Sequence, residues 1–325
     1  MGRGDETHEP FEELFAMRID RATQPWRDIF YTSRDGLRLY GRHYPSVAPQ
    51  RRPALCLAGL TRNSRDFHDL AIYLTDPGNP HTRDVYTLDY RGRGRSQHDP
   101  DWRNYTIESE VADVLDFMTV TSLGEVSLVG TSRGGIIALL LAVTRPTCLG
   151  AVVLNDIGPV INPEGLMRIV AYVGRVPLPT SWDEATDLVR RLSERQFPAI
   201  PEHHWAEIAR QWFNDDHGNP VHGYDQNIAR SIAMPLGELP TMWPQFEALA
   251  QRPCMVIRGE LSDILSAQTV EDMRLRHPSL VCHTVQDQGH APLLRDRQSQ
   301  TAIAEFLARA DLPARPTAVR GFARV

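Results

Sequence analysis

The sequence has little cysteine and no long apolar run. Only four cysteines occur among 325 residues, at Cys56, Cys148, Cys254 and Cys282, and none belongs to a Cys-x-x-Cys pair. Three of them fall inside apolar, strand-like runs, which is typical of reduced core residues in a cytoplasmic protein and argues against a disulfide scaffold. No segment approaches the roughly 18 consecutive apolar residues of a membrane span. The polar stretch 1–14 lacks the apolar region of a secretory signal, so we expect a cytoplasmic protein without a membrane partner.

Neither sign of charge is in large excess, and metal-binding spacings are lacking. The chain has 35 Lys and Arg against 41 Asp and Glu, a formal net charge of -6, which argues against nucleic acid as a partner. No His-x-x-x-His, Glu-x-x-His or Cys pair has ligand spacing, and on a helix the adjacent His203 and His204 would diverge by about 100°. We therefore expect neither a metal nor a cofactor.

Short apolar runs alternate with helix-like segments along most of the chain. This alternation predicts an α/β fold with a mostly parallel, doubly wound sheet. The expected strands are 28–32, 37–43, 53–57, 84–88, 126–129, 151–154, 254–258 and 280–285. The expected helices are 65–74, 106–121, 134–143, 269–276 and 301–310. A hairpin turn is expected at Asp35-Gly36, and a loose tail from Pro313 onward.

This alternation breaks between residues 158 and 243. The segment lacks a strong buried strand, shows short helix-like pieces and is rich in aromatic residues. Because this segment lies between two strands of a parallel sheet, it is expected to be an inserted helical cap over the carboxyl edge of the sheet. The predicted organisation is an α/β core of 1–157 and 244–325 with a cap of 158–243. The cap aromatics could be simple packing residues or the wall of a pocket, and Tyr172, Trp182 and Trp212 are the pocket candidates.

The most informative motif is Gly130-Thr131-Ser132-Arg133-Gly134, which follows an apolar strand and precedes a helix of small apolar residues. In this setting the motif predicts a nucleophile elbow, a tight turn that exposes the serine hydroxyl at the edge of the sheet. The flanking glycines are needed because side chains there would collide across the turn. A glycine-rich helix start without catalytic meaning is the plain alternative.

A serine nucleophile needs a base, and the base needs an orienting carboxylate. In such a sheet the chain order is Ser, then Asp or Glu, then His, each after a strand. His290 follows the last strand and is the candidate base, unless it is an ordinary surface histidine. Asp263 follows the preceding strand and is the preferred acid. Glu260 and Asp156, the latter also directly after a strand, are its rivals.

Acyl transfer also needs donors for the oxyanion. The expected donors are the backbone N–H of Arg133, after the nucleophile, and the N–H of Leu60 in the loop after strand 53–57. The alternative for this loop, Ala58-Gly59-Leu60, is an ordinary strand-to-helix turn.

Taken together, these motifs resemble the α/β-hydrolase fold, in its branch of lid-bearing esterases, lactonases and C–C hydrolases. The resemblance covers about residues 30–307 and rests on 130–135, Asp89-Tyr90-Arg91-Gly92-Arg93-Gly94-Arg95-Ser96, 259–263 and Gly289-His290. In this family the segment from Asp89 to Ser96 is usually structural. Many relatives have His-Gly where this chain has Ala58-Gly59, and Met or Gln where it has Arg133. The Arg133 side chain could form an ion pair with a neighbouring acid or recognise a polar group of the substrate.

The sequence therefore predicts a cofactor-independent serine hydrolase whose small-molecule substrate is a small to medium carboxylic ester or lactone. Two alternatives stay open. One is a C–C bond hydrolase acting on a ring-cleavage dienone acid, with Arg133 or Arg190 and Arg191 as binding groups. The other is a slow-turnover ligand receptor of the same fold. The acyl and alcohol groups are not specified by the sequence, and a homodimer is one candidate assembly.

Overall fold

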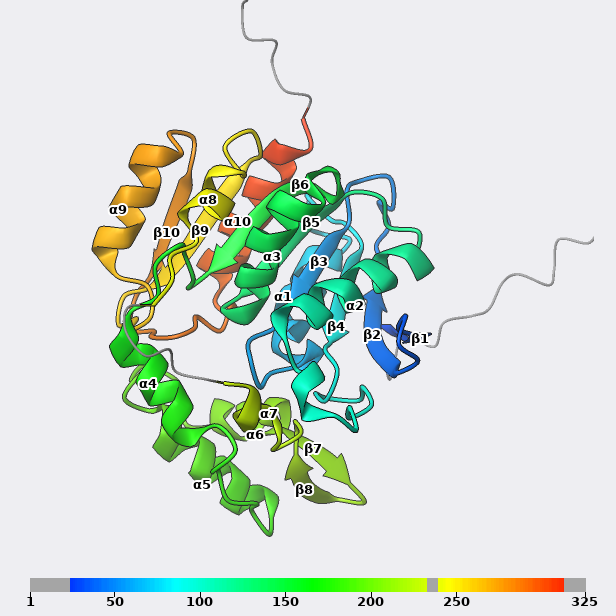
Figure 1. The fold of residues 1–325 in the computed structure, drawn as a ribbon, viewed down its shortest axis with the longest axis vertical. Coiled ribbons are helices and arrows are strands. Elements are labelled where there is room, and N and C mark those ends of the chain that lie inside the picture. The colour runs from blue at the N-terminus through cyan, green and yellow to red at the C-terminus, as the bar shows by residue number, and fades with distance from the viewer. Residues whose placement is uncertain (1–23, 233–238, 313–325) are drawn as a thin grey trace, which may run out of the picture.

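The computed structural model describes residues 24–232 and 239–312. The expectations for residues 1–14 and for the tail from Pro313 lie outside the described residues. The described chain forms a central sheet with helices on both faces and an inserted cap beside one edge of the sheet (Figure 1). This arrangement confirms the predicted α/β class. None of the described helices is both long enough and apolar enough to cross a membrane.

The central sheet has eight strands in the order β1-β2-β4-β3-β5-β6-β9-β10. The first two pairs in this order, β1 with β2 and β2 with β4, are antiparallel, and the remaining neighbours are parallel. Gly36 forms the β1–β2 turn with φ +94°, a conformation that favours glycine. The strands are β1 Arg27–Thr32, β2 Arg38–Tyr44, β3 Ala54–Leu57, β4 Val85–Asp89, β5 Val126–Thr131, β6 Leu149–Asn155, β9 Cys254–Gly259 and β10 Val281–Val285.

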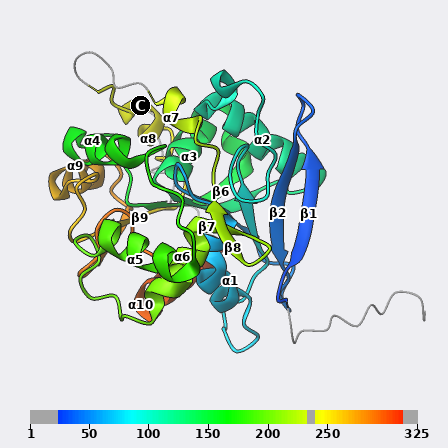
Figure 2. The same cartoon turned by 90° about the horizontal axis from the view of Figure 1, so that it is seen from below.

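Helices cover the two faces of this sheet. Figure 2 shows α1 and α10 on one face and α2, α3, α8 and α9 on the other. Helix α2 begins at a polar cap, Thr106, whose hydroxyl accepts the N–H of Ser109. The helices of the core are α1 His68–Thr75, α2 Ile107–Val120, α3 Arg133–Thr144, α8 Trp243–Glu247, α9 Ala267–Arg276 and α10 Arg297–Ala310. Three short 3-10 turns are η2 Ser64–Phe67, η3 Trp102–Asn104 and η4 Pro146–Cys148.

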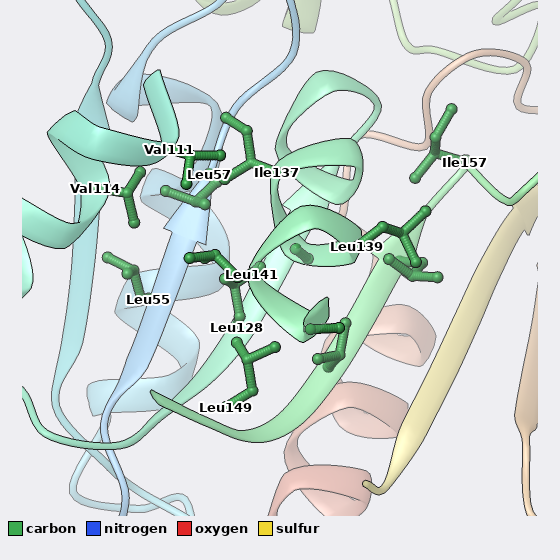
Figure 3. Packing of buried hydrophobic residues seen from close by; sticks show 14 of the residues in the cluster. Leu55, Leu57, Val111, Val114, Leu128, Ile137, Leu139, Leu141, Leu149 and Ile157 are labelled. Carbon is green, nitrogen blue, oxygen red and sulfur yellow. The ribbon is translucent and has the colours of Figure 1, made fainter. Parts of the chain in front are cut away.

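Strands β3, β5 and β6 are buried along almost their whole length, because helices lie on both sides of them. Figure 3 shows Leu139 and Leu141 of α3 packed among strand residues such as Leu128 and Leu149. Buried aliphatic side chains of this kind stabilise the fold by about 1.5–3 kcal/mol each. They fix the elements that carry the residues at the carboxyl edge of the sheet.

The cap lies between β6 and β9 and has a small apolar core of its own. That core includes Val189 of α5, Ile208 of α6 and Phe213. The cap also contains a β-hairpin, β7–β8, that the sequence did not predict, since its strands are too short and polar to show alternation. The cap elements are α4 Pro163–Tyr172, α5 Trp182–Ser193, α6 His204–Trp212, β7 Phe213–Asp216, β8 Asn219–His222 and α7 Ile228–Ser231.

Candidate active site

Ser132 stands on a sharp turn between β5 and α3. Its φ is +51°, in the left-handed region that is rare for residues with a side chain. A Cβ added to Gly130 would lie 2.5 Å from the backbone of Gly134, and one added to Gly134 would lie 2.1 Å from the Leu57 carbonyl oxygen. Both glycines are therefore required by the turn. The strand–turn–helix setting predicted from the sequence is present.

His290 lies in the loop between β10 and α10 and bridges two polar side chains. Its Nε2 is 2.9 Å from Oγ of Ser132, and its Nδ1 is 2.8 Å from Oδ2 of Asp156. The His290 side chain is only 7% exposed and that of Asp156 is fully buried. A histidine held between a hydroxyl and a buried carboxylate can accept the hydroxyl proton, because the carboxylate stabilises the resulting imidazolium.

Asp156 follows β6 directly, with φ +55°. Besides His290, its carboxylate accepts the N–H of Gly259 at 2.8 Å and the Oγ–H of Ser262 at 2.6 Å. Three donors on a buried carboxylate compensate for the loss of water and hold it in one orientation. Because β6 neighbours β5, the end of β6 is also the nearest strand end to Ser132 on this side.

This geometry corrects the expectation that Asp263 orients His290. Both Asp263 oxygens face Arg168 of α4, at 2.6 and 2.8 Å from Nε and Nη2. Burial raises the pKa of the Asp263 carboxyl, but the Arg168 hydrogen bonds and charge outweigh this and hold it below its usual range. The rival Glu260 accepts the backbone N–H of Asp287 instead. In the loop after β9, Ser262 therefore contacts Asp156 in the site, whereas Asp263 contacts Arg168 of the cap.

The two expected oxyanion donors come from the loop after β3, which carries Leu60, and from the first residue of α3, Arg133. The N–H of Leu60 has no acceptor within the described chain, and the N–H of Arg133 belongs to the first turn of α3, where helices leave N–H groups unpaired. The loop that carries Leu60 is fixed to α3, because Gly134 donates its N–H to the carbonyl of Ala58 at 3.1 Å. Both N–H groups are therefore free to bind an oxyanion beside Ser132.

The Arg133 side chain forms an ion pair. Its Nε lies 2.5 Å from Oε2 of Glu110, a fully buried carboxylate that also pairs with Arg93. Arg133 is absent from the described residues that line the cavity at Ser132. Of the two interpretations left open by the sequence, the structure shows the ion pair. Asp89 also has a structural contact, since it accepts the backbone N–H groups of Ser64 and Arg95.

A cavity of about 120 Å³ opens between Ser132 and the cap. Tyr172 and Trp212, two of the expected pocket residues, line it, but Trp182 does not. Trp182 instead donates its indole N–H to the carbonyl of Gly218 at 3.0 Å and packs, partly buried, against the cap core, so its assignment to the pocket is corrected. Most of the wall is apolar. Several of its large members were not among the expected pocket residues: Phe67, Ile169, Phe197, Trp205, Ile208, Leu293 and Leu294.

Within residues 24–232 and 239–312, no group of three or more His, Cys, Asp and Glu side chains is arranged to hold a metal ion.

A mostly parallel sheet with a serine elbow, and with Asp and His after later strands, defines the class of α/β-hydrolase-fold proteins. The chain matches the model of the alpha/beta hydrolase family over residues 54–305, and it belongs to that family.

Several similar proteins are named as hydrolases. The chain is 31% identical over 268 residues to the 3-hydroxybutyrate-oligomer hydrolase of Cupriavidus necator, covering 78% of this chain and 87% of that relative. It is 26% identical over 235 residues to the 2-(acetamidomethylene)succinate hydrolase of Mesorhizobium japonicum, covering 71% and 79%. The crystal structure of an alpha/beta hydrolase from Novosphingobium aromaticivorans is similar with a TM-score of 0.80 and 38% identity, covering 88% of this chain and 99% of that one.

Proposed function

We propose that the protein is a serine hydrolase that cleaves a small to medium carboxylic ester through an acyl-enzyme. The observation that carries this proposal is the chain of hydrogen bonds from Ser132 through His290 to Asp156. A serine hydroxyl without such a base is a poor nucleophile at neutral pH.

In the proposed reaction, Ser132 Oγ attacks the ester carbonyl carbon while His290 Nε2 takes the hydroxyl proton. Asp156 keeps the imidazole oriented and stabilises its positive charge. The N–H groups of Leu60 and Arg133 bind the oxyanion. His290 then protonates the leaving alcohol, and a water molecule activated by the same histidine releases the acid and frees Ser132.

The cavity and the relatives support a short, partly apolar acyl or alcohol group. The wall of the cavity is mostly apolar, with a small number of polar groups near Ser132 and His290. The Cupriavidus necator relative, 31% identical over most of its length, is named for an ester of a short hydroxy acid. An ester of a short hydroxy acid is therefore the substrate class that we favour, and a lactone is the cyclic form of the same bond.

The C–C hydrolase alternative loses the groups that the sequence offered for it. Arg133 is paired with Glu110. Arg190 is paired with Glu202 on the exposed side of the cap. Arg191 is exposed, and none of the three arginines is among the described residues that line the cavity.

The experiment is a screen of short-chain esters, lactones and dienone acids with the wild type and the Ser132→Ala variant side by side. We expect multiple turnovers of short esters, and a loss of at least about 10³-fold in kcat in Ser132→Ala. Ser279→Ala, an exposed serine outside the cavity, is the matched control and should retain full activity. A single turnover or none on every ester would favour the receptor alternative, and turnover of dienone acids alone would favour the C–C hydrolase.

A further inference from the structure

Arg62 brings a positive charge to the cavity that contains Ser132 and His290. It follows the oxyanion loop, and its N–H donates to the Gly59 carbonyl at 3.1 Å, which closes a turn. A Cβ placed on Gly59 would lie 3.4 Å from Cγ of Arg62 and 3.9 Å from Cβ of Ser132. The Arg62 side chain and Ser132 therefore both lie next to Gly59. Arg62 is on the same loop as the Leu60 donor.

The guanidinium of Arg62 has hydrogen-bonding capacity left for a ligand. Its Nε and Nη2 bind the two carboxylate oxygens of Asp66 at 2.9 and 2.5 Å, while Nη1 has no acceptor within the described chain. A guanidinium has five N–H groups, so three remain for another acceptor. The side chain is 17% exposed and lies over the ring of Trp212, 4.7 Å from its centre. Stacking of this kind holds the planar group in one orientation.

Arg62 is also the one arginine among the described residues that line this mostly apolar cavity, and its partner Asp66 is the one carboxylate among them. A smaller cavity adjoins the first, and the two share part of their wall: Thr61, Arg62, Tyr172 and Trp212. A ligand that extends from Ser132 toward the smaller cavity must therefore pass the guanidinium. Arginine in a partly dry site is the residue best suited to hold a carboxylate through paired N–H donors.

We propose that Arg62 binds a free carboxylate carried by the ester substrate. This inference rests on the proposed ester hydrolase function. It narrows the substrate class to esters that end in a carboxylate within a few bonds of the scissile carbonyl, such as the linear dimer of a 3-hydroxy acid. Asp66 occupies two of the five donors and repels a second carboxylate, so it limits the affinity for such substrates.

The test compares the linear 3-hydroxybutyrate dimer as the free acid with the same dimer capped as a terminal primary amide. The amide removes the charge without adding a second ester bond. For the wild type we expect kcat/KM to favour the acid by at least about tenfold. In Arg62→Gln the acid-to-amide ratio should fall by about 10- to 100-fold, mainly through KM. In Asp66→Asn the ratio should rise, because the competing carboxylate is gone.

Arg210→Gln is the matched control, since it removes one exposed cap arginine that is outside the lining of the cavity and should leave the ratio unchanged. An equal loss on both dimers in Arg62→Gln, or no loss, would overturn the inference and assign Arg62 to packing alone. Turnover of simple chromogenic esters without preference for the acid dimer would overturn it while the ester hydrolase proposal stands. Absence of turnover on every ester would overturn both.

Discussion

Gln196 of the cap accepts the backbone N–H of His290 at its Oε1, over a distance of 2.9 Å. The Gln196 backbone carbonyl also accepts the N–H of Gly289 at 2.6 Å. A Cβ on Gly289 would overlap the Gln196 side chain, so the two segments are in close contact. Leu293, from the same loop, packs against the cap core. The loop that carries His290 is thus held by the cap as well as by Asp156.

We predict that Gln196→Ala lowers kcat by about 10- to 100-fold with a small change in KM, because a histidine displaced by about 1 Å no longer meets the serine hydroxyl in a productive geometry. Gln196→Glu keeps an acceptor oxygen at the same place and should restore most of kcat. Steady-state kinetics with a chromogenic ester measure both variants. Arg195→Ala, an exposed neighbour, is the control. Equal activity of Gln196→Ala and Arg195→Ala would contradict a positioning role.

A second prediction separates the two candidate acids. Asp156→Asn should lose at least about 10³-fold in kcat, because the amide favours the wrong tautomer of His290 and cannot stabilise the imidazolium. Asp263→Asn should retain more than about a tenth of the activity, since its carboxylate faces Arg168. The kcat values of the two purified variants give the answer directly. A larger loss of kcat in Asp263→Asn than in Asp156→Asn would mean that Asp263 orients His290.

The sequence predicted the fold well because the central strands β3, β5 and β6 are buried on both faces. Such strands appear as continuous apolar runs, and each predicted strand of the central sheet lies within two residues of an observed one. Helix starts were predicted less accurately. Helix α10 begins at Arg297, four residues before the expected 301, because Asp296 caps it by accepting the N–H of Ser299 and the first turn is polar.

The site was only partly predictable. Ser132 stands in a motif whose glycines are required by local backbone geometry, and such requirements can be read from a sequence. The choice between Asp156 and Asp263 depends on where the loop after β9 turns, which is set by the packing of α4. A Cβ on Gly165 of α4 would lie 2.3 Å from the Asp263 carbonyl oxygen. Contacts between the cap and the core, including that of Gln196 with the His290 loop, join residues far apart in the chain. They therefore leave no local pattern in the sequence from which they could be predicted.

A third prediction concerns the cap aromatics. Trp212 lines the cavity, so Trp212→Ala should enlarge it and shift the preference among ester chain lengths toward longer groups. Trp182→Ala should instead lower the thermal midpoint of unfolding with an unchanged chain-length profile, because Trp182 packs against the cap core and does not line the cavity. Relative kcat/KM values over a series of ester lengths, together with melting curves, test the pair. A shifted profile in Trp182→Ala alone would contradict this division.

The last prediction concerns the ion pair between the cap and the core. Arg168 holds the pKa of Asp263 below its usual range in the folded protein, so the ionised carboxylate stabilises the fold at neutral pH. This contribution is fully present above the unfolded-state pKa of about 3.9 and is lost as the pH falls through the lower folded-state value. Asp263→Asn should therefore reduce the free energy of unfolding at pH 7 by up to about 1 kcal/mol, a modest amount because the pair is partly exposed to solvent.

Urea unfolding of the wild type and Asp263→Asn, measured from about pH 7 down to about pH 3, should show this difference shrinking only below about pH 4. In an Arg168→Gln background the same substitution should have almost no effect, since its partner is already gone. Asp187→Asn, which removes an exposed carboxylate 3.6 Å from Arg190, is the control and should change little at any pH. If Asp263→Asn instead stabilises the protein at pH 7, the cost of burying the carboxylate exceeds its attraction to Arg168, and the ion pair does not help to hold the cap on the core.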